Sequence, residues 1–273
     1  MSQSDAGSGA TSFGKVVVLG VGNMGGAIVR GLLAAGVDPG QLLGVEPAHR
    51  HDQLSSDLGI AFTDDAAAAV ADADVLLVAV KPNMVASVLA DLPVTERTLV
   101  VSIAAGITTA TLEGLVPRAR VVRVMPNTAA LVGEGMAGIS GGSSARPEDV
   151  ETAVRLLSAV GRAVVVPESQ QDLVVAASGS GIAYFFMVAE AMIEAGVTLG
   201  LTRAQAGDLV RQTIAGASAM LATGEHPVVL REQVTSPGGT TAAALSTLEA
   251  HGLRSAILDA MVAARDKSAA LGA

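Results

Sequence analysis

Short apolar runs alternate with helical patterns along the chain up to residue 166. The runs are rich in Val, Leu and Ile, which is typical of strands buried on both faces of a sheet. They predict strands at residues 16–19, 42–45, 60–62, 75–80, 98–102, 121–124, 137–140 and 163–166. Helices are predicted between them at residues 83–92, 109–115 and 147–160. This alternation predicts an α/β fold with a doubly wound, mainly parallel sheet and helices on both faces.

The pattern changes after Pro167, where the strand signals stop. Helices are predicted at residues 170–177, 183–196, 203–223, 228–233, 241–251 and 253–271. Thr202 before one helix and Pro227 in the first turn of another are typical helix start signals. The sequence therefore predicts an α/β domain at residues 14–166 and an all-helical domain at residues 167–273. Residues 1–13 are rich in Ser, Gly and Ala and are predicted to form a disordered tail.

A glycine-rich turn follows the first predicted strand directly. It has the sequence Gly20-Val21-Gly22-Asn23-Met24-Gly25, and a helix is predicted after it at residues 26–36. In a dinucleotide-binding turn the first glycine allows the tight turn, and the second lets a pyrophosphate approach the backbone. The third lets the helix lie close to the strand, while the helix N-terminus binds the phosphates. An ordinary glycine-rich turn in an α/β protein is the alternative.

The second predicted strand ends at Glu46. In a Rossmann domain a carboxylate at about this spacing accepts hydrogen bonds from the ribose hydroxyls. A strand before the turn, a helix after it and this carboxylate together favour a dinucleotide site over an ordinary turn. Because a carboxylate repels a 2′-phosphate, Glu46 favours NADH over NADPH. His49 and Arg50, which lie nearby in the sequence, weaken that preference.

Composition narrows the possible partners. Half of the 273 residues are apolar but only 2% are aromatic, so the core is expected to consist of Ala, Val, Leu, Ile and Met. A net charge of −9 makes the chain a poor nucleic-acid binder. The absence of cysteine excludes disulfides and thiolate chemistry and fits a cytoplasmic location. The four histidines do not have the spacing of metal ligands, so no metal site is expected.

The apolar stretch at residues 182–201 is the segment most similar to a membrane span. It contains Glu190 and Glu194, and two carboxylates near the middle of a bilayer would be unfavourable. We therefore expect a helix buried at an interface and no membrane insertion. The predicted helices after Pro167 have wide apolar faces, which we expect to pack against a second copy of the chain in a homodimer.

Three further segments are predicted to follow strand ends, where ligands bind in open α/β sheets. They are Ala79-Val80-Lys81-Pro82, Ser102-Ile103-Ala104-Ala105-Gly106 and Met125-Pro126-Asn127-Thr128. Each also has a simpler explanation. The first can be a solvated lysine before a proline that starts a helix, the second a plain turn of small residues, and the third a turn with Asn127 as N-cap.

Two loops in the helical part combine glycine, hydroxyl groups and a following helix. They are Ser178-Gly179-Ser180-Gly181 and Thr235-Ser236-Pro237-Gly238-Gly239-Thr240-Thr241. Free N–H groups at a helix N-terminus suit a carboxylate, although helix capping by Ser and Thr is the alternative. The only lysines are Lys15, Lys81 and Lys267. A site without a strong proton donor suits a substrate that is already electrophilic, such as a protonated imine.

These segments resemble the pyrroline-5-carboxylate reductase family. The resemblance runs from about Val16 to Leu271 and is most specific at residues 78–82, 101–106, 123–128, 178–184 and 235–241. It implies an NAD(P)H-dependent imine reductase of proline biosynthesis with a Rossmann domain and an all-helical dimerisation domain. It also implies intertwined homodimers, which in the family often assemble into decamers.

The resemblance also implies roles for individual residues. By the resemblance, the cofactor would contact Leu19, Gly20, Val21, Gly22, Asn23, Met24, Ala79, Val80, Lys81, Pro82, Ile103, Ala104, Ala105 and Gln233. The Rossmann pattern adds Gly25 and Glu46 to this set, and Glu46 stands where the family often has a small hydroxyl residue. The substrate would contact Glu168, Gly238, Gly239, Thr240 and Thr241. The backbone of residues 238–240 would hold the substrate carboxylate. Thr241 would be catalytic, with its hydroxyl hydrogen-bonded to the ring nitrogen.

Some positions depart from the family pattern. Ile182 stands where the family usually has Pro, and Ala66 lies near a family position that is polar. A hydroxyacid dehydrogenase on the same fold remains an alternative, but such enzymes use a lysine in the helical domain, and residues 83–266 contain none. Another imine reductase, or a dinucleotide-binding protein without turnover, is also possible.

Overall fold

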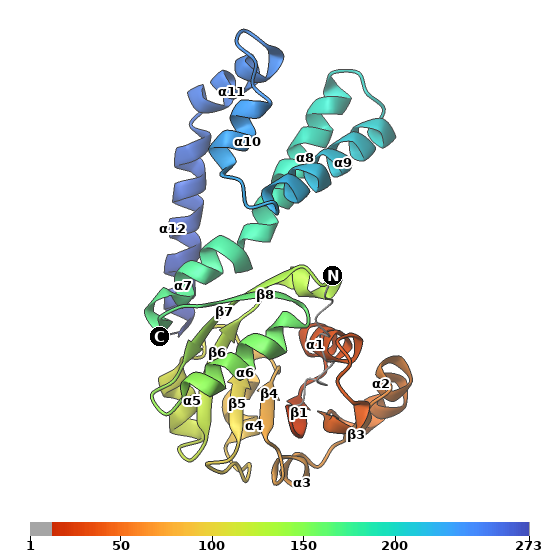
Figure 1. Ribbon diagram of the computed structural model, residues 1–273, viewed down its shortest axis with the longest axis vertical. Coiled ribbons are helices and arrows are strands. Elements are labelled where there is room, and N and C mark those ends of the chain that lie inside the picture. The colour runs from red at the N-terminus through yellow and green to blue at the C-terminus, as the bar shows by residue number, and fades with distance from the viewer. Residues whose placement is uncertain (1–12, 273) are drawn as a thin grey trace, which may run out of the picture. The chain divides into compact units, whose positions relative to one another are not determined.

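The computed structural model describes residues 13–272, which form two compact units (Figure 1). The first unit contains the described residues up to Gly179 together with the end of the chain from Arg265. The second unit is Ser180–Ala264. The division between the two units thus falls after Gly179, beyond Pro167, and the last residues of the chain belong to the first unit. Residues 1–12 of the predicted tail lie outside the described part of the chain.

An eight-stranded sheet forms the centre of the first unit, with the strand order β3-β2-β1-β4-β5-β6-β7-β8. Its strands are β1 (Val16–Leu19), β2 (Leu42–Val45), β3 (Ala61–Thr63), β4 (Val75–Val78), β5 (Leu99–Ser102), β6 (Arg120–Met125), β7 (Gly135–Gly141) and β8 (Gly161–Val165). The β6–β7 pair is antiparallel and the other pairs are parallel. The predicted Rossmann-type, mainly parallel sheet is confirmed.

In the described part of the chain, six helices connect these strands, and a seventh, α7, follows the last strand. They are α1 (Asn23–Ala34), α2 (His51–Leu58), α3 (Ala66–Val70), α4 (Val85–Leu89), α5 (Thr109–Leu115), α6 (Pro147–Ser158) and α7 (Gln171–Val174). Single 3-10 turns are η1 (Pro39–Gln41), η2 (Ala48–Arg50), η3 (Pro82–Met84), η4 (Thr128–Val132) and η5 (Glu168–Gln170). The prediction that the first helix begins at Gly26 is wrong, because α1 begins at Asn23 and includes both Gly25 and Gly26.

Both faces of the sheet are buried, which explains the unbroken apolar runs. Val16 and Val18 of β1 belong to one core cluster, and Val17 and Leu19 belong to the other. Alternate side chains of a strand point to opposite faces, so all four residues must be apolar. Helices α1 and α6 cover the first cluster, and α3, α4 and α5 contribute to the second.

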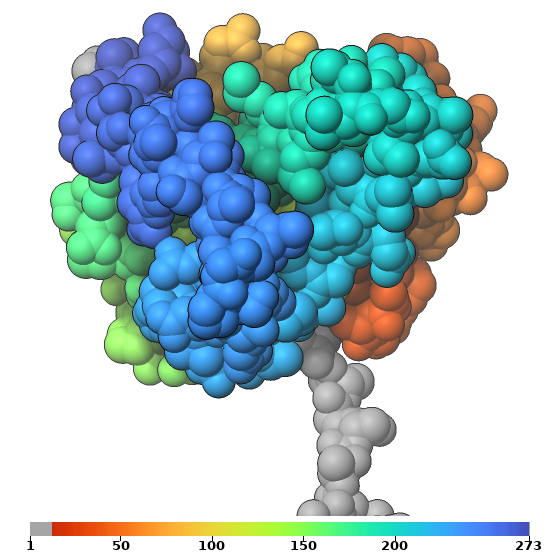
Figure 2. Space-filling view, turned by 90° about the horizontal axis from the view of Figure 1, so that it is seen from above, coloured from red at the N-terminus to blue at the C-terminus, as the bar shows by residue number. Residues whose placement is uncertain are grey.

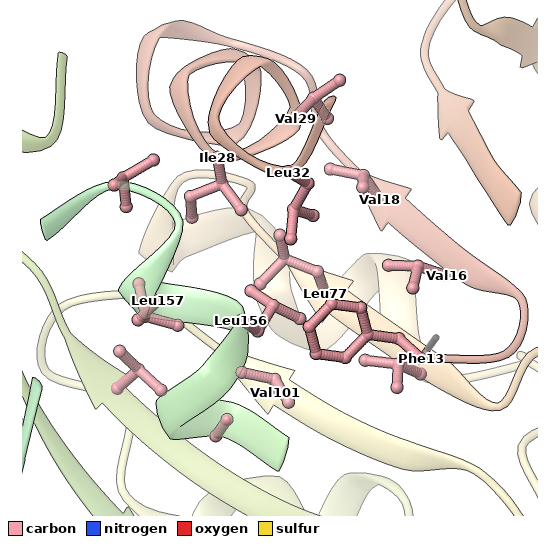
Figure 3. Packing of buried hydrophobic residues seen from close by; sticks show 14 of the residues in the cluster. Phe13, Val16, Val18, Ile28, Val29, Leu32, Leu77, Val101, Leu156 and Leu157 are labelled. Atoms are coloured by element: carbon pink, nitrogen blue, oxygen red, sulfur yellow. The ribbon is translucent and has the colours of Figure 1, made fainter. Parts of the chain in front are cut away.

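Figure 3 shows how the first cluster packs, with Ile28 and Leu32 of α1 close to Leu156 and Leu157 of α6. Each of these side chains is at most 1% exposed. Burial of such a side chain stabilises the fold by about 1.5–3 kcal/mol. Phe13 is 7% exposed in the same cluster, and the Arg155 guanidinium lies 5.4 Å from its ring centre. The inclusion of Phe13 in a disordered tail is therefore wrong.

The second unit is helical, and residues 168–272 of the described chain contain no strand. Its helices are α8 (Gly181–Thr198), α9 (Arg203–Leu221), α10 (Pro227–Gln233), α11 (Thr240–Ala250) and the first part of α12 (Leu253–Gly272), whose end belongs to the first unit. Thr202 caps α9 as predicted, through a capping box with Gln205. The Arg203 guanidinium also binds both carboxylate oxygens of Glu194 on α8, at 2.6 and 3.1 Å.

Large apolar side chains cover the surface of this helical unit, where Phe185, Phe186 and Met187 are 64–72% exposed. A groove of about 580 Å³ between α9 and α10 is lined by apolar groups of Met220, Leu221, Leu230 and Val234. Figure 2 shows the surface of these helices, with α8 and α9 in teal and α10–α12 in blue. Apolar surface of this extent marks an interaction site.

One helical run, Glu168–Thr198, is long and apolar enough to cross a membrane by length and composition alone, and 11% of its apolar window is buried. It includes the Ser178–Gly181 segment, which was predicted to be a loop. That prediction is wrong. Residues Val175–Gly179 form a turn of π-helix between α7 and α8, and their backbone continues the helical path. π-Helical turns occur frequently at functional sites, so the segment is still a candidate part of the functional site.

Candidate active site

The glycine turn between β1 and α1 has the geometry expected of a dinucleotide site. Gly20 has a φ of +92°, and a Cβ there would lie 2.8 Å from Val80 Cγ1. A Cβ on Gly25 would fall inside contact distance of the Gly20 carbonyl oxygen. These two glycines therefore allow the turn and the close approach of helix and strand.

Gly22 differs from its two neighbours, because no described atom lies within 4 Å of a Cβ placed on it. It is exposed, and it is the N-cap of α1. A glycine has no side chain to cap the helix, so the first N–H groups of α1 are available to an anion. Gly22 thus leaves open space where a pyrophosphate can reach the backbone, as the sequence predicts.

The loops after β4 and β5 lie beside this turn. The Ala79 N–H donates to the Leu19 carbonyl oxygen at 2.9 Å, and the Ile103 N–H donates to that of Val78 at 3.0 Å. The carboxyl ends of β1, β4 and β5 therefore form one continuous edge, and it carries the predicted cofactor segments 19–25, 79–82 and 103–105. Lys81 and Pro82 are exposed, whereas Ala104 is 4% exposed.

Glu46 lies at the end of β2, next to the glycine turn, and is 9% exposed. Its Oε1 accepts a hydrogen bond from the Val21 N–H at 2.5 Å. Its Oε2 forms an ion pair with Arg50 at 2.7 Å. The carboxylate predicted to bind ribose hydroxyls is therefore in the predicted place, and in this structure both of its oxygens have protein partners.

Glu168 accepts hydrogen bonds from side chains and backbone of the first unit. Its Oε1 accepts from the Thr109 N–H at 2.6 Å and from Arg123 at 3.2 Å, and its Oε2 accepts a short hydrogen bond from the Thr109 hydroxyl. Burial raises the pKa of this carboxyl, but the hydrogen bonds from Thr109 and the charge of Arg123 outweigh it and lower the pKa below its ordinary value. Glu168 is therefore ionised at neutral pH.

The partners of Glu168 were missed by reasoning from the sequence. The Arg123 side chain is 7% exposed, and such a buried guanidinium requires a counter-charge. One feature of the sequence could have indicated this buried ion pair: an arginine stands inside the apolar run Val121-Val122-Arg123-Val124, which makes up most of β6.

Asn127 follows β6 and is 8% exposed. Its Nδ2 donates to the Ser178 hydroxyl oxygen at 3.0 Å, and its Oδ1 accepts from the Met136 N–H at 3.1 Å. The residue is the N-cap of η4, but within the described structure its side chain makes no capping hydrogen bond. The alternative of a simple Asn cap is thus wrong, since Asn127 ties the π-helical turn to the sheet.

The second unit carries the other predicted loop, between α10 and α11. Gly238 has a φ of +68°, which favours glycine, and Gly239 is the N-cap of α11. Because Gly239 has no side chain, it cannot cap the N–H groups at the start of α11, which belong to Thr240 and Thr241. Gln233 is the last residue of α10 and is exposed. The loop is therefore a backbone site suited to a carboxylate.

Within residues 13–272, no group of three His, Cys, Asp or Glu side chains is placed to hold a metal ion. A strand, a glycine turn and a helix at the edge of a parallel sheet define a dinucleotide-binding Rossmann protein.

Comparison with known proteins identifies the family. Residues 168–271 match the pyrroline-5-carboxylate reductase dimerisation family, and residues 15–106 match a family described as NADP oxidoreductase, coenzyme F420-dependent. The pyrroline-5-carboxylate reductase of Methanosarcina acetivorans is 43% identical over 264 residues, which cover 94% of this chain and 98% of that one. The chain belongs to the pyrroline-5-carboxylate reductase family.

Solved structures agree with this assignment. A pyrroline-5-carboxylate reductase from Coxiella burnetii is 36% identical with a TM-score of 0.91, covering 96% of this chain and all of that one. The Plasmodium falciparum enzyme, solved with NADP bound, is 31% identical with a TM-score of 0.82, covering 95% and 98% of the two chains. The comparisons support a nicotinamide dinucleotide as the cofactor and a homo-oligomer as the assembly.

The contrast between Gly22 and Gly25 gives a test of the glycine turn. Gly22→Ala places a methyl group in open space, so we expect the free energy of unfolding to change by less than about 0.5 kcal/mol. We expect its affinity for NADH to fall about tenfold or more, because the pyrophosphate loses hydrogen bonds from backbone N–H groups. Isothermal titration calorimetry measures the affinity, and urea unfolding measures the stability.

Gly25→Ala is the matched comparison, because its methyl group would overlap the Gly20 carbonyl oxygen. Its unfolding free energy should fall by about 1–3 kcal/mol. If Gly22→Ala bound NADH as tightly as the wild type, the pyrophosphate would not approach the backbone at Gly22.

Proposed function

We propose that this protein reduces 1-pyrroline-5-carboxylate to L-proline with NAD(P)H. The single observation that carries the proposal is the 43% identity to a pyrroline-5-carboxylate reductase over nearly the whole chain. In this proposal, the edge of the sheet at β1, β4 and β5 would hold the cofactor, and the backbone site at Gly239 would hold the substrate.

The residues of the first unit fit a dinucleotide. Gly22 leaves open space at the N-terminus of α1, where the pyrophosphate would bind. The segments at residues 79–82 and 103–105 line the same edge and would hold the rest of the cofactor, with Gln233 as a further contact. When bound, the reduced nicotinamide supplies a hydride to the substrate.

The substrate carboxylate would accept hydrogen bonds from the backbone N–H groups of Gly238 and Thr240, at the N-terminus of α11. It would also accept one from the Gly239 N–H, which in this structure donates to the Ser236 carbonyl oxygen at 3.0 Å and would have to exchange that partner for the substrate. The Thr241 hydroxyl would bind the ring nitrogen and hold or relay its proton. Glu168, ionised and held by Thr109 and Arg123, completes the proposed substrate set, since a negative charge favours a protonated imine.

Catalysis in this proposal comes mostly from positioning. Holding two reactants in the right geometry can lower a barrier by roughly 7 kcal/mol or more. No lysine lies in residues 83–266, so the second unit, Ser180–Ala264, has no proton donor of that kind. A substrate that arrives as an iminium ion does not need one, whereas a ketone would.

A hydroxyacid dehydrogenase and a dinucleotide-binding protein without turnover are the rivals. The missing lysine disfavours the first, and the backbone site at residues 236–241 disfavours the second. The absorbance of reduced nicotinamide separates all three, because only the proposed enzyme consumes it on addition of pyrroline-5-carboxylate. No loss of absorbance above background, with either NADH or NADPH, would contradict the proposal.

We further propose that the protein acts in the cytoplasm without inserting into a membrane. The apolar run at Glu168–Thr198 contains Glu168, Asp172, Glu190 and Glu194, which a bilayer would disfavour. A second subunit is the more favourable cover for its exposed phenylalanines, and dimers would assemble further into a decamer.

Thr241 is tested by Thr241→Ala. Loss of the hydroxyl removes the hydrogen bond to the ring nitrogen, so kcat should fall about a hundredfold while the Kd for NADH stays unchanged. Thr247→Ala is the control, because Thr247 is an exposed threonine on the same helix whose hydroxyl donates to the Ala243 carbonyl oxygen. Wild-type turnover in Thr241→Ala would remove this residue from the mechanism.

The cofactor preference follows from Glu46. We expect a higher kcat/KM with NADH than with NADPH, because a buried carboxylate at the end of β2 repels a 2′-phosphate. Steady-state kinetics with both cofactors at saturating pyrroline-5-carboxylate measure this directly. A kcat/KM that is roughly tenfold higher with NADPH would overturn it.

The assembly is tested in solution. Light scattering at micromolar concentration should give a dimer or a multiple of it. Phe186→Asp places a charge on the exposed apolar face of α8 and should shift the protein toward monomer. Val132→Asp, at a 77% exposed side chain of η4, should leave the mass unchanged. A monodisperse wild-type monomer would contradict the proposed dimer.

A further inference from the structure

We infer that the last turn of α12 holds the loop after β5 in place, and that Ser268 and Asp172 are positioning residues for the nicotinamide half of the cofactor. The inference rests on the proposed function only in assuming that a nicotinamide dinucleotide binds along the sheet edge. It uses contacts within the first unit, to which the loop, α7 and the residues from Arg265 all belong.

The loop after β5 and the last turn of α12 approach each other backbone to backbone. Gly106 has a φ of +78°, and a Cβ on it would lie 3.3 Å from the Leu271 carbonyl oxygen. A Cβ on Gly272 would lie 3.0 Å from the Gly106 carbonyl oxygen. Both distances are shorter than an ordinary van der Waals contact, so the approach needs glycine on both sides.

One hydrogen bond anchors this turn of α12. The Ser268 hydroxyl donates to Asp172 Oδ1 at 2.6 Å and so joins the end of α12 to α7 (Figure 1). Ser268 is 8% exposed, and a buried hydroxyl is costly without a partner. Ser268 lies one helical turn before Leu271 and Gly272, so the bond fixes the backbone that touches Gly106.

The same loop is also held at its two ends. At its start, the Ile103 N–H donates to the Val78 carbonyl oxygen at 3.0 Å. At its far end, Thr109 begins α5 and donates its N–H and its hydroxyl to Glu168. The contact of α12 with Gly106 therefore supports the loop between these two attachments.

The place of the loop in the sheet determines which half of the cofactor it faces. The strand order runs β2-β1-β4-β5, with the pyrophosphate expected at the turn after β1 and the adenosine ribose at the end of β2. A dinucleotide along this edge must therefore extend its nicotinamide over β4 and β5. A loop that is already held in place costs the cofactor less ordering entropy, and hydride transfer depends on exact placement.

A purely structural role makes a different prediction. If Ser268 and Asp172 only fastened α12 to the fold, their loss would lower the stability and leave every ligand bound equally well. Selective loss of the nicotinamide half is therefore the signature of a positioning role.

The experiment compares NADH with adenosine 5′-diphosphoribose, which has the adenosine, the pyrophosphate and the second ribose but no nicotinamide. Isothermal titration calorimetry on the whole chain gives both affinities. Ser268→Ala should weaken NADH about threefold or more, because the anchoring hydrogen bond is lost, and should leave the diphosphoribose unchanged. Ser255→Ala is the control, because Ser255 is an exposed serine of the same helix whose hydroxyl donates to the Gly252 carbonyl oxygen.

Asp172 is the other half of the anchor. Asp172→Ala should weaken NADH as much as Ser268→Ala does, and the double variant should lose no more than either single variant. Asp172→Asn keeps an acceptor oxygen in a side chain of the same shape, so it should retain most of the wild-type affinity.

Gly272→Val tests the contact without removing the anchor. Its side chain would press against the Gly106 carbonyl oxygen and displace the loop, so NADH should again be weakened and the diphosphoribose should not. Gly114→Val is the matched control, because Gly114 is a helical glycine of α5 with no described atom within 4 Å of a Cβ placed on it.

Equal loss of both ligands, or no loss of either, in Ser268→Ala and Gly272→Val would overturn the inference. Thermal unfolding of each variant confirms that the fold is retained. Because binding is measured without turnover, the expected pattern in a protein that does not consume pyrroline-5-carboxylate would refute the proposed function and leave the role of α12 intact. Turnover of pyrroline-5-carboxylate without selective loss of NADH would refute the role of α12 alone.

Discussion

The close approach of α1 to β1 is the constraint on which the rest of the structure depends. It requires Gly25, since a side chain there would overlap the carbonyl oxygen of Gly20, and it requires the left-handed conformation of Gly20. The same approach places the N-terminus of α1 at the carboxyl end of β1, beside which the loops after β4 and β5 begin. The cofactor edge is therefore a consequence of how the first strand and helix pack, and Gly22 leaves it open.

Buried and partly buried polar side chains connect the loops around this edge. Glu46 connects the end of β2 to the glycine turn through Val21, and Glu168 connects Thr109 of α5 to Arg123 of β6. Asn127 joins the end of β6 to the π-helical turn at Ser178. Each of these polar side chains has the hydrogen-bond partners described above, as expected for polar groups removed from solvent. The contribution of Glu168 to stability is present above the pKa of its unfolded form and is lost as the pH falls through its lowered folded pKa.

Patterns set by burial could be predicted from the sequence, and patterns set by partners distant in sequence could not. Strand β1 was predicted to the residue, because both faces of it are buried and its run is unbroken.

The start of α1 was missed because Gly25 and Gly26 are typical of a turn, although close packing keeps them in the helix. The Ser178–Gly181 segment was mistaken for a loop because Ser and Gly favour loops locally, whereas in the structure the helical path continues through it and the Ser178 hydroxyl accepts a hydrogen bond from Asn127. Arg123 and Thr109 lie far from Glu168 in the sequence, so local composition carried no signal for these contacts. Phe13 was assigned to the tail because the residues before it are rich in Ser, Gly and Ala, although it packs in the same cluster as the nearby Val16. The roles of Thr241 and of residues 238–240 remain predictions.

The central claim is that a dinucleotide on the sheet edge presents its reactive ring to a substrate held by the backbone at residues 238–241. A crystal structure of the assembled protein with NADP⁺ or NAD⁺ and L-proline tests it most directly. The account predicts the nicotinamide C4 at about 3–3.5 Å from the proline ring carbon, with the proline carboxylate on the N–H groups at the start of α11. Residues 238–241 lying away from the nicotinamide in every subunit of that structure would contradict it.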